Sequence, residues 1–336
     1  MGIKKIFPAL LFLAILMGGC KRSVSPTKSP EATEQQQLQQ GSLRSDTLPK
    51  LPPGNLNFIV VNDMGRREES EQQTIADLLG RQAAESRFDF IAVAGDPIHD
   101  DGVTSVTDEE WNLKFERIYT AESLQKLPYY VVSGNHEYRG NVQAILDYSK
   151  VSERWNAPAR YYTLERLIGK SEQKALFVFI DTSPLIDKYR ESGEYSDAEE
   201  QNMELQLLWL DSVLTASNER WTFVIGHHPI YAYTEKVESE RTDLQTRVGT
   251  IIEKHAVDFY ICGHIHNFQY IKPFGCKVNY IVNSSASLSR DVNPIDGTIF
   301  YNPDPGYTTF TVSADSAQFY FINHSGTIVY NHTIKK

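Results

Sequence analysis

Short apolar runs alternate with amphipathic stretches along most of the chain. The runs NFIVVND, FDFIAVAGD and LPYYVVSGNHE each end in polar residues, and the stretches between them space their apolar residues by three and four. Apolar runs of this length predict buried strands, and the spacing between them is typical of amphipathic helices. Strands that alternate with helices predict an α/β fold.

The same alternation continues to about residue 266. Further strands are expected in ALFVFIDTS, WTFVIGHHP and VDFYICGHIH. The expected helices cover residues 68–86, 108–120, 141–155, 197–217 and 243–256. Residues 307–335 instead alternate apolar and polar positions between turn signals, which predicts antiparallel strands. Because the sequence shows no repeat and no second linker, we expect a single domain over residues 54–336.

Polar residues follow most of the predicted strands directly, usually next to a glycine. These residues are Asp63, Asp96, Asn135, His136, His227, His228, His264 and His266. Each of them alone has an ordinary structural explanation, as a turn residue, a helix cap or a buried imidazole. Together they point to function, because ligands of open α/β sheets bind outside the carboxyl ends of the strands.

The types of side chain in this set indicate metal binding. Carboxylates, an amide oxygen and imidazoles suit iron, zinc or manganese better than calcium. The set is larger than one tetrahedral zinc ion requires, and one carboxylate that bridges two ions accounts for the excess. The sequence therefore predicts a two-metal site with the ions about 3.5–4 Å apart.

The order of the motifs resembles the calcineurin-like metallophosphoesterase superfamily and, within it, the purple acid phosphatases of the tartrate-resistant type. The resemblance runs from about Asn57 to Tyr270 and includes NDMG, GDPIH, GNHEYRGNV, IGHHPIY and GHIHNFQY. It implies a four-layer α-β-β-α sandwich of two mixed sheets flanked by helices. It also implies hydrolysis of phosphoesters with release of phosphate at a dinuclear metal centre.

The same resemblance implies a role for each site residue. The implied ligands are Asp63, Asp96 and His266 for the first ion, typically iron, and Asp96, Asn135, His227 and His264 for a second, divalent ion such as Zn, Fe or Mn. Asp96 would bridge the two ions. His136 would stabilise the phosphoryl group or protonate the departing alkoxide.

Two positions depart from the family pattern. His99 stands where the purple enzymes have an iron-binding tyrosine, three residues after the bridging Asp96. We expect His99 to take over as a ligand; the alternative is that it faces solvent and that water fills the position. The loop after GHHP lacks the histidine of similar enzymes, and Lys236 falls near that place. His228 is the candidate for a second catalytic group, or else a residue outside the ligand shell.

Charge and cysteine content limit the other possibilities. The formal net charge of −10 argues against binding nucleic acid through a basic surface, but a bound metal still allows an anionic substrate. Cys262 and Cys276 are the cysteines that follow residue 53, which is too few for a disulfide scaffold. One disulfide between them is left open.

The amino-terminal segment predicts export and lipidation. Lys4 and Lys5 precede the apolar run IFPALLFLAILM, and small residues stand directly before Cys20. The run is too short for a transmembrane helix and is typical of a secretion signal. The pattern resembles a bacterial lipoprotein signal over residues 1–20, with Cys20 lipidated; the alternative is an ordinary cleaved signal peptide with an incidental cysteine. Residues 21–53 lack aromatics, which predicts a disordered tether.

The leading hypothesis is metal-dependent phosphomonoester hydrolysis, of acid-phosphatase type, by a lipid-anchored protein of the bacterial cell envelope. A phosphodiesterase, a nucleotidase or a phosphoprotein phosphatase would use the same site. The loops at residues 184–200 and 232–245 would then select the substrate. A non-catalytic, metal-binding envelope lipoprotein is the alternative from another class, and metal analysis separates it from the enzymes.

Overall fold

The computed structural model describes residues 47–66 and 71–336. The predicted signal peptide, Cys20 and most of the predicted tether lie outside the described residues. Within the described part of the chain, no helix is long and apolar enough to cross a membrane. The predicted boundary between tether and domain, at residues 53 and 54, stays a prediction.

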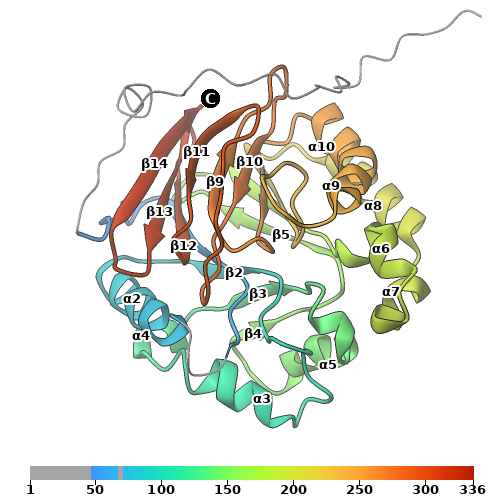
Figure 1. Ribbon diagram of the computed structural model, residues 1–336. Helices are drawn as coiled ribbons and strands as arrows, with labels where there is room; N and C mark the ends of the chain where they lie inside the picture. Colours follow the sequence, from blue (N-terminus) through green and yellow to red (C-terminus); the bar gives the residue numbers. More distant parts are fainter. Residues whose placement is uncertain (1–46, 67–70) are drawn as a thin grey trace, which may run out of the picture. The chain divides into compact units, whose positions relative to one another are not determined.

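Two seven-stranded mixed sheets form the centre of the fold (Figure 1). The first sheet contains, in spatial order, β14 (Ile328–Lys335), β13 (Ser316–Asn323), β12 (Gly306–Val312), β1 (Leu56–Val61), β2 (Phe90–Ala94), β3 (Tyr129–Val132) and β4 (Trp155–Asn156). The second contains β11 (Thr298–Asn302), β9 (Phe268–Ile271), β10 (Asn279–Val282), β8 (Phe259–Cys262), β7 (Trp221–Ile225), β6 (Lys174–Phe179) and β5 (Tyr162–Leu167). The strands that precede the site residues are parallel neighbours within each sheet.

Helices cover the outer face of each sheet. On one side, Figure 1 shows α2 (Gln72–Glu85), α3 (Glu109–Trp111), α4 (Glu122–Gln125) and α5 (Val142–Asp147). On the other it shows α6 (Asp187–Arg190), α7 (Ser196–Glu200), α8 (Met203–Ala216), α9 (Glu238–Leu244) and α10 (Thr250–Lys254). The predicted fold, an α-β-β-α sandwich, is confirmed.

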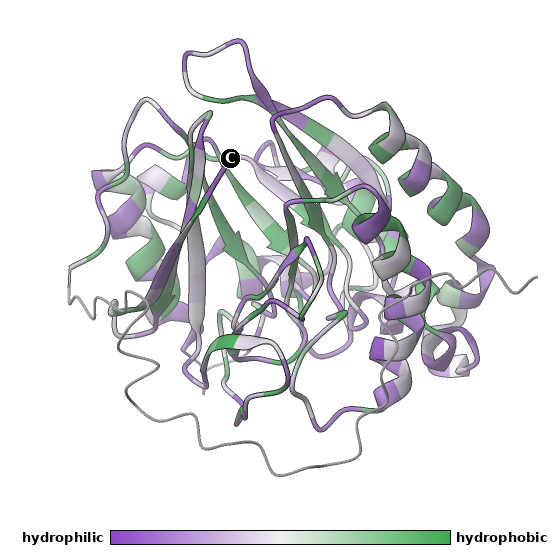
Figure 2. Cartoon of the chain, turned by 90° about the horizontal axis from the view of Figure 1, so that it is seen from above, coloured by the Kyte–Doolittle hydropathy of each residue, from purple (hydrophilic) through white to green (hydrophobic). Residues whose placement is uncertain are grey.

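Alternation along the strands explains the layers. In β1, Phe58 and Val60 belong to the core between the sheets, whereas Ile59 and Val61 belong to the core under α2. The ring centroid of Phe58 lies 5.1 Å from that of Phe177 in the opposite sheet, edge to face, a favourable aromatic geometry. Strands buried on both faces read as continuous apolar runs, and Figure 2 shows hydrophobic strands in the interior.

The helix predicted over residues 197–217 is wrong as a single element. The structure divides it into α7 and α8 at Gln201 and Asn202. Asn202 Oδ1 accepts a hydrogen bond of 3.0 Å from the backbone N–H of Leu205. Its side chain thereby caps a new helix, as asparagine does at helix amino ends, and this local bond replaces one continuous helix.

Other predicted elements differ in their bounds. The helix expected from residue 243 begins earlier, at Glu238, and continues through a π-helical turn (Gln245–Gly249). The helix expected over 141–155 ends sooner, because residues after Asp147 form a 3₁₀ turn and then β4. The antiparallel strands expected over 307–335 are confirmed as β12, β13 and β14. Cys262 and Cys276 are not joined to each other by a disulfide.

Candidate metal centre

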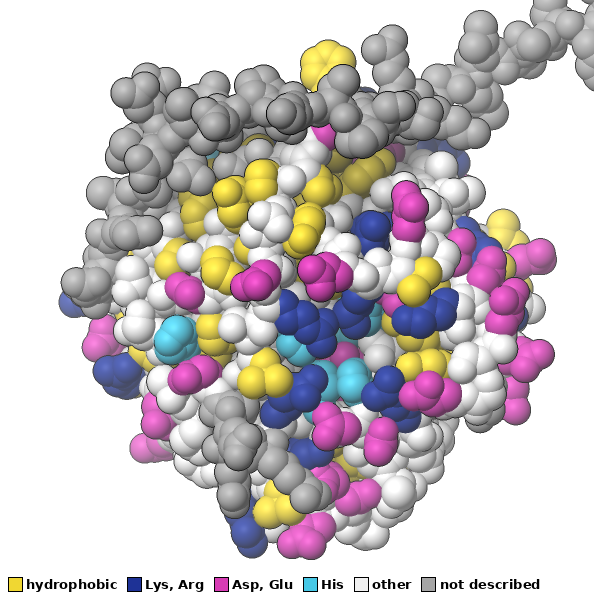
Figure 3. Space-filling model, in the orientation of Figure 1, with side chains coloured by type: hydrophobic (Ala, Val, Ile, Leu, Met, Phe, Trp, Pro, Cys, Tyr) yellow, Lys and Arg dark blue, Asp and Glu magenta, His cyan; other side chains and the backbone are white. Residues whose placement is uncertain are grey.

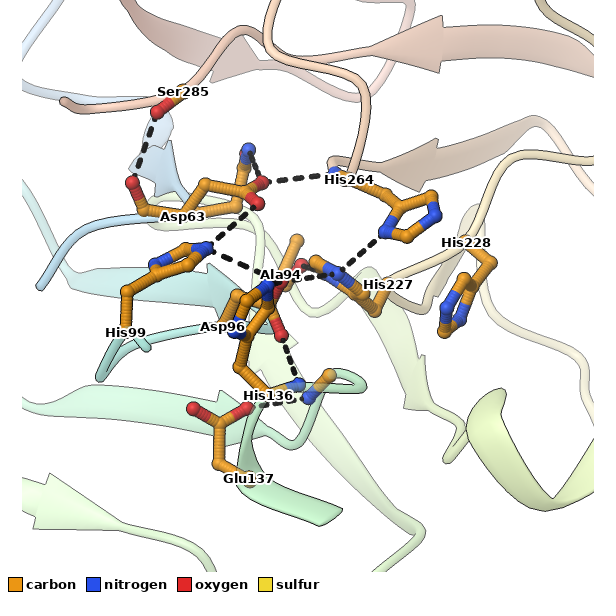
Figure 4. Close-up of polar contacts among 12 residues, drawn as sticks. Asp63, Ala94, Asp96, His99, His136, Glu137, His227, His228, His264 and Ser285 are labelled. Atoms are coloured by element: carbon orange, nitrogen blue, oxygen red, sulfur yellow. Dashed lines mark hydrogen bonds and ion pairs between the residues drawn. The ribbon is translucent and has the colours of Figure 1, made fainter. Parts of the chain in front are cut away.

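The predicted site residues meet at one edge of the sandwich. β1, β2 and β3 end there from one sheet, and β7 and β8 end there from the other. Figure 4 shows that the side chains after these strands, from both sheets, converge on two carboxylates, Asp63 and Asp96.

The chain bends sharply where it delivers these side chains. Asp63, Asp96, His264 and His266 have φ angles of 49°, 48°, 72° and 57°. Among the described non-glycine residues, only Ala256 shares this left-handed backbone. Such a conformation costs about 1–3 kcal/mol and persists where the surrounding structure enforces it, commonly at functional sites. The bends turn these side chains toward one another at this edge of the sandwich (Figure 4).

Two glycines of the motifs let the sheets approach each other. A Cβ atom on Gly95 would lie 2.3 Å from His227 Nδ1, and one on Gly134 would lie 2.1 Å from Asp96 Oδ1. Gly95 also has a φ of 85°, which L side chains rarely adopt. Larger residues at either position would push the site groups apart.

One group of site residues surrounds Asp63. Its Oδ1 lies 2.9 Å from His266 Nε2 and 3.7 Å from His99 Nε2. The same nitrogen of His99 lies 3.5 Å from Asp96 Oδ2. Both ring nitrogens of His99 are buried without a hydrogen-bond partner. The ring of His99 therefore fills the space between the two carboxylates without hydrogen bonding to either.

A second group shares the same oxygen of Asp96. Asp96 Oδ2 lies 2.9 Å from His227 Nε2, and that nitrogen lies 3.1 Å from His264 Nδ1. Asn135, which follows the third strand of this edge, has a buried Oδ1 atom without a hydrogen-bond partner. Asp96 Oδ2 is thus the atom at which the two groups meet.

The carboxylates carry charge although they are buried. Burial alone would raise the pKa of Asp63, but the charge and hydrogen bond of His266 hold it well below its usual range. Burial acts in the same way on Asp96, and His227 and His136 lower its pKa well below the usual range. The two carboxylates lie 3.7 and 3.5 Å from the same nitrogen of His99, and two buried negative charges side by side need compensating positive charge.

The histidines differ in protonation. Burial lowers the pKa of His99 and of His264 well below the usual range, so both rings are neutral and offer a lone pair. His227 is the exception: burial lowers its pKa, but Asp96 raises it to about 9. A metal ion needs a neutral imidazole and would take the place of this proton between His227 and Asp96.

These residues fit a pair of metal ions. Among the described residues, the sets whose ligand atoms lie close enough to share an ion are Asp63, His99 and His266; Asp96, His99 and His136; Asp63, Asp96 and His227; and His227, His228 and His264. The sets overlap in both carboxylates, as expected when a carboxylate joins neighbouring ions. Mixed oxygen and nitrogen ligands suit iron, zinc or manganese.

Comparison with known proteins shows the family to which this chain belongs. The family model described as calcineurin-like phosphoesterase matches residues 56–268. The chain belongs to this family. Tartrate-resistant acid phosphatase type 5 of Oryctolagus cuniculus is 32% identical over 69% of this chain and 73% of its own length. Purple acid phosphatase 4 of Arabidopsis thaliana is 29% identical, with 82% of each chain covered.

Solved structures agree on the fold. The structure titled "GAP50 the anchor in the inner membrane complex of Plasmodium" has a TM-score of 0.71 at 23% identity, covering 84% of this chain and 89% of that one. Purple acid phosphatase PPD1 from yellow lupin has a TM-score of 0.58 at 16% identity, covering 86% of this chain and 55% of that one. The protein is a purple-acid-phosphatase-like metallophosphoesterase with a dinuclear type of site.

Relative to that family, His99 is the clearest departure in this chain. Its side chain is only 1% exposed, so the alternative in which it faces solvent is wrong. The ring instead occupies the space beside Asp63 and Asp96 described above. This position excludes the solvent-facing alternative, and the replacement of the tyrosine by His99 as a ligand stays a prediction.

His136 and His228 lie in different surroundings. The His136 side chain is 16% exposed, and its Nε2 lies 3.8 Å from Asp96 Oδ2. His228 is fully buried. Its Nδ1 lies 2.8 Å from Thr182 Oγ1, which also accepts from the backbone N–H groups of His227 and His228. The threonine hydroxyl therefore donates to Nδ1 of His228, and this favours a place outside the ligand shell.

Several residues that support the site were not predicted from the sequence. Asn62 Nδ2 donates to Asp63 Oδ2 at 2.7 Å, and the hydroxyls of Ser285 and Ser287 donate to the Asp63 carbonyl at 2.9 and 2.6 Å. Glu137 accepts from the backbone N–H of Gly134 at 2.7 Å. Asn62 and Glu137 adjoin the recognised ligands, but the hydrogen bonds by which a side chain supports a neighbouring site leave no pattern in a sequence.

Cationic side chains surround the opening of the site. Figure 3 shows Lys and Arg gathered around the histidines on this face. Arg139 Nη1 lies 3.3 Å from His136 Nδ1, and Lys236 and Arg290 line an adjoining cavity of about 620 Å³. Arg66 Nη1 lies 3.4 Å from Asp100 Oδ1, and the backbone carbonyl of Asp100 contacts His136 Nδ1. The site therefore has a positive rim, which we define as Arg66, Arg139, Lys236 and Arg290.

Proposed function

We propose that this protein hydrolyses phosphomonoesters at a dinuclear metal centre formed by the residues predicted from the sequence. These residues are Asp63, Asp96, His99 and His266 for one ion, and Asp96, Asn135, His227 and His264 for the other. The observation that carries the proposal is Asp96 Oδ2, which lies 3.5 Å from His99 Nε2 and 2.9 Å from His227 Nε2. An oxygen so placed could serve as a ligand to both ions. Iron with a second divalent ion is the proposed pair.

The chain's own residues supply the remaining parts of the reaction. When bound, a metal pair polarises the phosphoryl group and provides a nucleophile near neutral pH. His136 stands at the accessible side of Asp96, where it can contact a phosphoryl oxygen or give a proton to the departing oxygen. Its Nδ1 contacts the backbone carbonyl of Asp100, which orients the ring. The positive rim concentrates an anionic ester at the opening.

A substrate panel combined with metal analysis tests this proposal. The wild-type protein should bind two ions per chain and release phosphate from alkyl and aryl monoesters faster than from diesters, nucleotides or a phosphopeptide. Asp96→Ala should abolish turnover and lose metal, whereas Asp101→Ala, an exposed carboxylate nearby, should do neither. Near-normal activity in a folded Asp96→Ala protein would contradict the bridge. Absence of bound metal in the wild type would favour the non-catalytic alternative.

We also propose that the enzyme works in the bacterial cell envelope, held by lipid on Cys20. The support is the sequence of residues 1–20, with its basic start, short apolar run and small residues before cysteine. Cells fed an alkyne fatty acid should label the wild type but not Cys20→Ser, and only the labelled protein should sediment with membranes. Equal labelling of both would show that Cys20 is incidental.

A further inference from the structure

Glu240 is a buried carboxylate beside the site that belongs to none of the proposed ligands. It lies in α9, within the loop region 232–245, and is only 1% exposed. Its Oε2 lies 3.1 Å from Nε2 of His264. Among the described residues, Glu240 joins none of the sets that could share a metal ion. Its hydrogen-bonding contact with a proposed ligand is the one to His264.

The two nitrogens of His264 face different partners. Nδ1 lies 3.1 Å from His227 Nε2, on the side of Asp96, whereas Nε2 faces Glu240. An imidazole that offers a lone pair at Nδ1 carries its proton on Nε2, and this proton then points at the carboxylate. A carboxylate in this position fixes the tautomer and the ring orientation and makes the histidine a stronger ligand.

The other oxygen of Glu240 is held just as firmly. Glu240 Oε1 accepts a hydrogen bond of 2.6 Å from Lys188 Nζ and one of 2.9 Å from the Tyr189 hydroxyl. A buried carboxylate is tolerated when it is paired and hydrogen-bonded in this way. The Tyr189 ring also lies 4.8 Å from that of His228. The carboxylate can thus neither rotate away from His264 nor lose its charge compensation without disturbing α6.

α6 in turn is fastened to the segment that follows α9. Both Asp187 carboxylate oxygens accept from Arg247 Nη2 at 2.7 Å. The backbone N–H of Asp187 donates to Asp243 Oδ2 at 2.8 Å. These contacts connect α6, α9 and the π-helical turn into one support behind Glu240.

We propose that Glu240 is a positioning residue for the second metal site. It holds His264 with the proton on Nε2 and with Nδ1 turned toward the ion shared with His227, and Lys188 and Tyr189 hold Glu240 in place. The inference rests on the proposed dinuclear function. Unlike the proposed function itself, the inference predicts that the binding affinity of one ion depends on Glu240 and that of the other ion does not.

Zinc binding to the full-length protein in detergent tests this role. Metal-free wild type, Glu240→Gln and Glu240→Ala would be titrated with Zn²⁺ against a chromophoric chelator, and bound zinc would be counted by elemental analysis. Loss of a partner outside the ligand shell typically weakens metal binding by about 10–100-fold. We expect a loss of this size for one ion only, smaller in Glu240→Gln, which keeps an acceptor oxygen, and larger in Glu240→Ala.

Two further variants separate positioning from general damage. Glu238→Gln changes an exposed glutamate of the same helix and should leave both affinities unchanged. Tyr189→Phe removes one hydrogen bond to Glu240 and should weaken the same ion as Glu240→Gln, by a smaller factor. If Glu240→Ala fails to fold, Glu240→Gln and Tyr189→Phe carry the test.

Three outcomes would overturn or redirect the inference. Wild-type affinity for both ions in folded Glu240→Gln and Glu240→Ala would overturn it. Equal weakening of both ions, together with a lower melting temperature of the metal-free protein, would show a structural role and overturn it as well. A wild type that binds fewer than two zinc ions would contradict the dinuclear proposal itself.

Discussion

At the scale of single residues, access to solvent separates the histidines of the site. His227 and His228 are fully buried, and His99, His264 and His266 are nearly so. His136 alone among the site histidines is partly exposed, with Nε2 still 3.8 Å from Asp96 Oδ2. A side chain that contacts both the substrate and the metal centre must be partly exposed and close to Asp96, as His136 is.

Replacement of His136 by Ala should therefore impair chemistry and spare metal binding. We expect two bound ions and a turnover that falls by about 10²–10⁴-fold, the usual contribution of general acid catalysis. The fall should be larger for an alkyl phosphate than for nitrophenyl phosphate, whose leaving group hardly needs a proton. Equal losses on both substrates, measured as kcat, would show that His136 binds the phosphoryl group and donates no proton.

At the scale of elements, Asp181 links β6 to its neighbours. The Tyr138 hydroxyl donates to Asp181 Oδ2 at 2.5 Å. The Gln206 side chain of α8 bonds the backbone N–H and C=O of Asp181 at 2.8 and 2.9 Å. Burial raises the pKa of Asp181 to about 7, although Tyr138 and Arg160 lower it. Between about pH 4 and about pH 7 the folded protein therefore holds a proton here that the unfolded chain has released.

This proton gives a pH dependence with a definite sign. The unfolded carboxyl titrates near pH 4 and the folded one near pH 7. Between these values the folded state binds more protons, so the stability contributed by Asp181 falls as pH rises. Asp181→Asn keeps the shape of the side chain and cannot ionise. As pH rises, its free energy of unfolding should therefore increase relative to that of the wild type by a few kcal/mol, on the order of 1.4 kcal/mol per pH unit of the pKa shift. Urea unfolding of both metal-free proteins at about pH 5 and about pH 8 measures this increase. The same difference in free energy of unfolding between variant and wild type at both pH values would contradict the prediction.

The elements also show what the sequence could predict. Asp63 and Asp96 were found because each ends an apolar run, and the sheets bring such strand ends to one edge. Glu240 was missed because α9 begins five residues before the predicted helix, so its register was unknown. Ser285 was missed because it follows β10 (Asn279–Val282), a strand that the sequence analysis did not predict. Contacts that depend on how one loop folds over another leave no periodic signal.

At the scale of the whole molecule, local and overall charge have opposite signs. The chain carries a formal net charge of −10, whereas Figure 3 shows the histidines surrounded by Lys and Arg. An overall negative field repels a phosphate dianion, and the positive rim attracts it. The rim is closer to the arriving substrate, and charged walls near a site focus the field there.

Salt should therefore slow the enzyme. Raising the ionic strength from about 0.01 M to about 0.1 M shortens the screening length from about 30 Å to about 10 Å. If the rim dominates, kcat/KM for a dianionic monoester falls several-fold over this range, and the fall shrinks in Lys236→Met/Arg290→Met. The matched control is Lys126→Met/Lys150→Met, which removes the same charge from side chains that are 71% and 79% exposed and should keep the wild-type salt dependence. A kcat/KM that rises with salt in the wild type would mean that the overall negative field governs association, and that the rim acts only after the substrate has arrived.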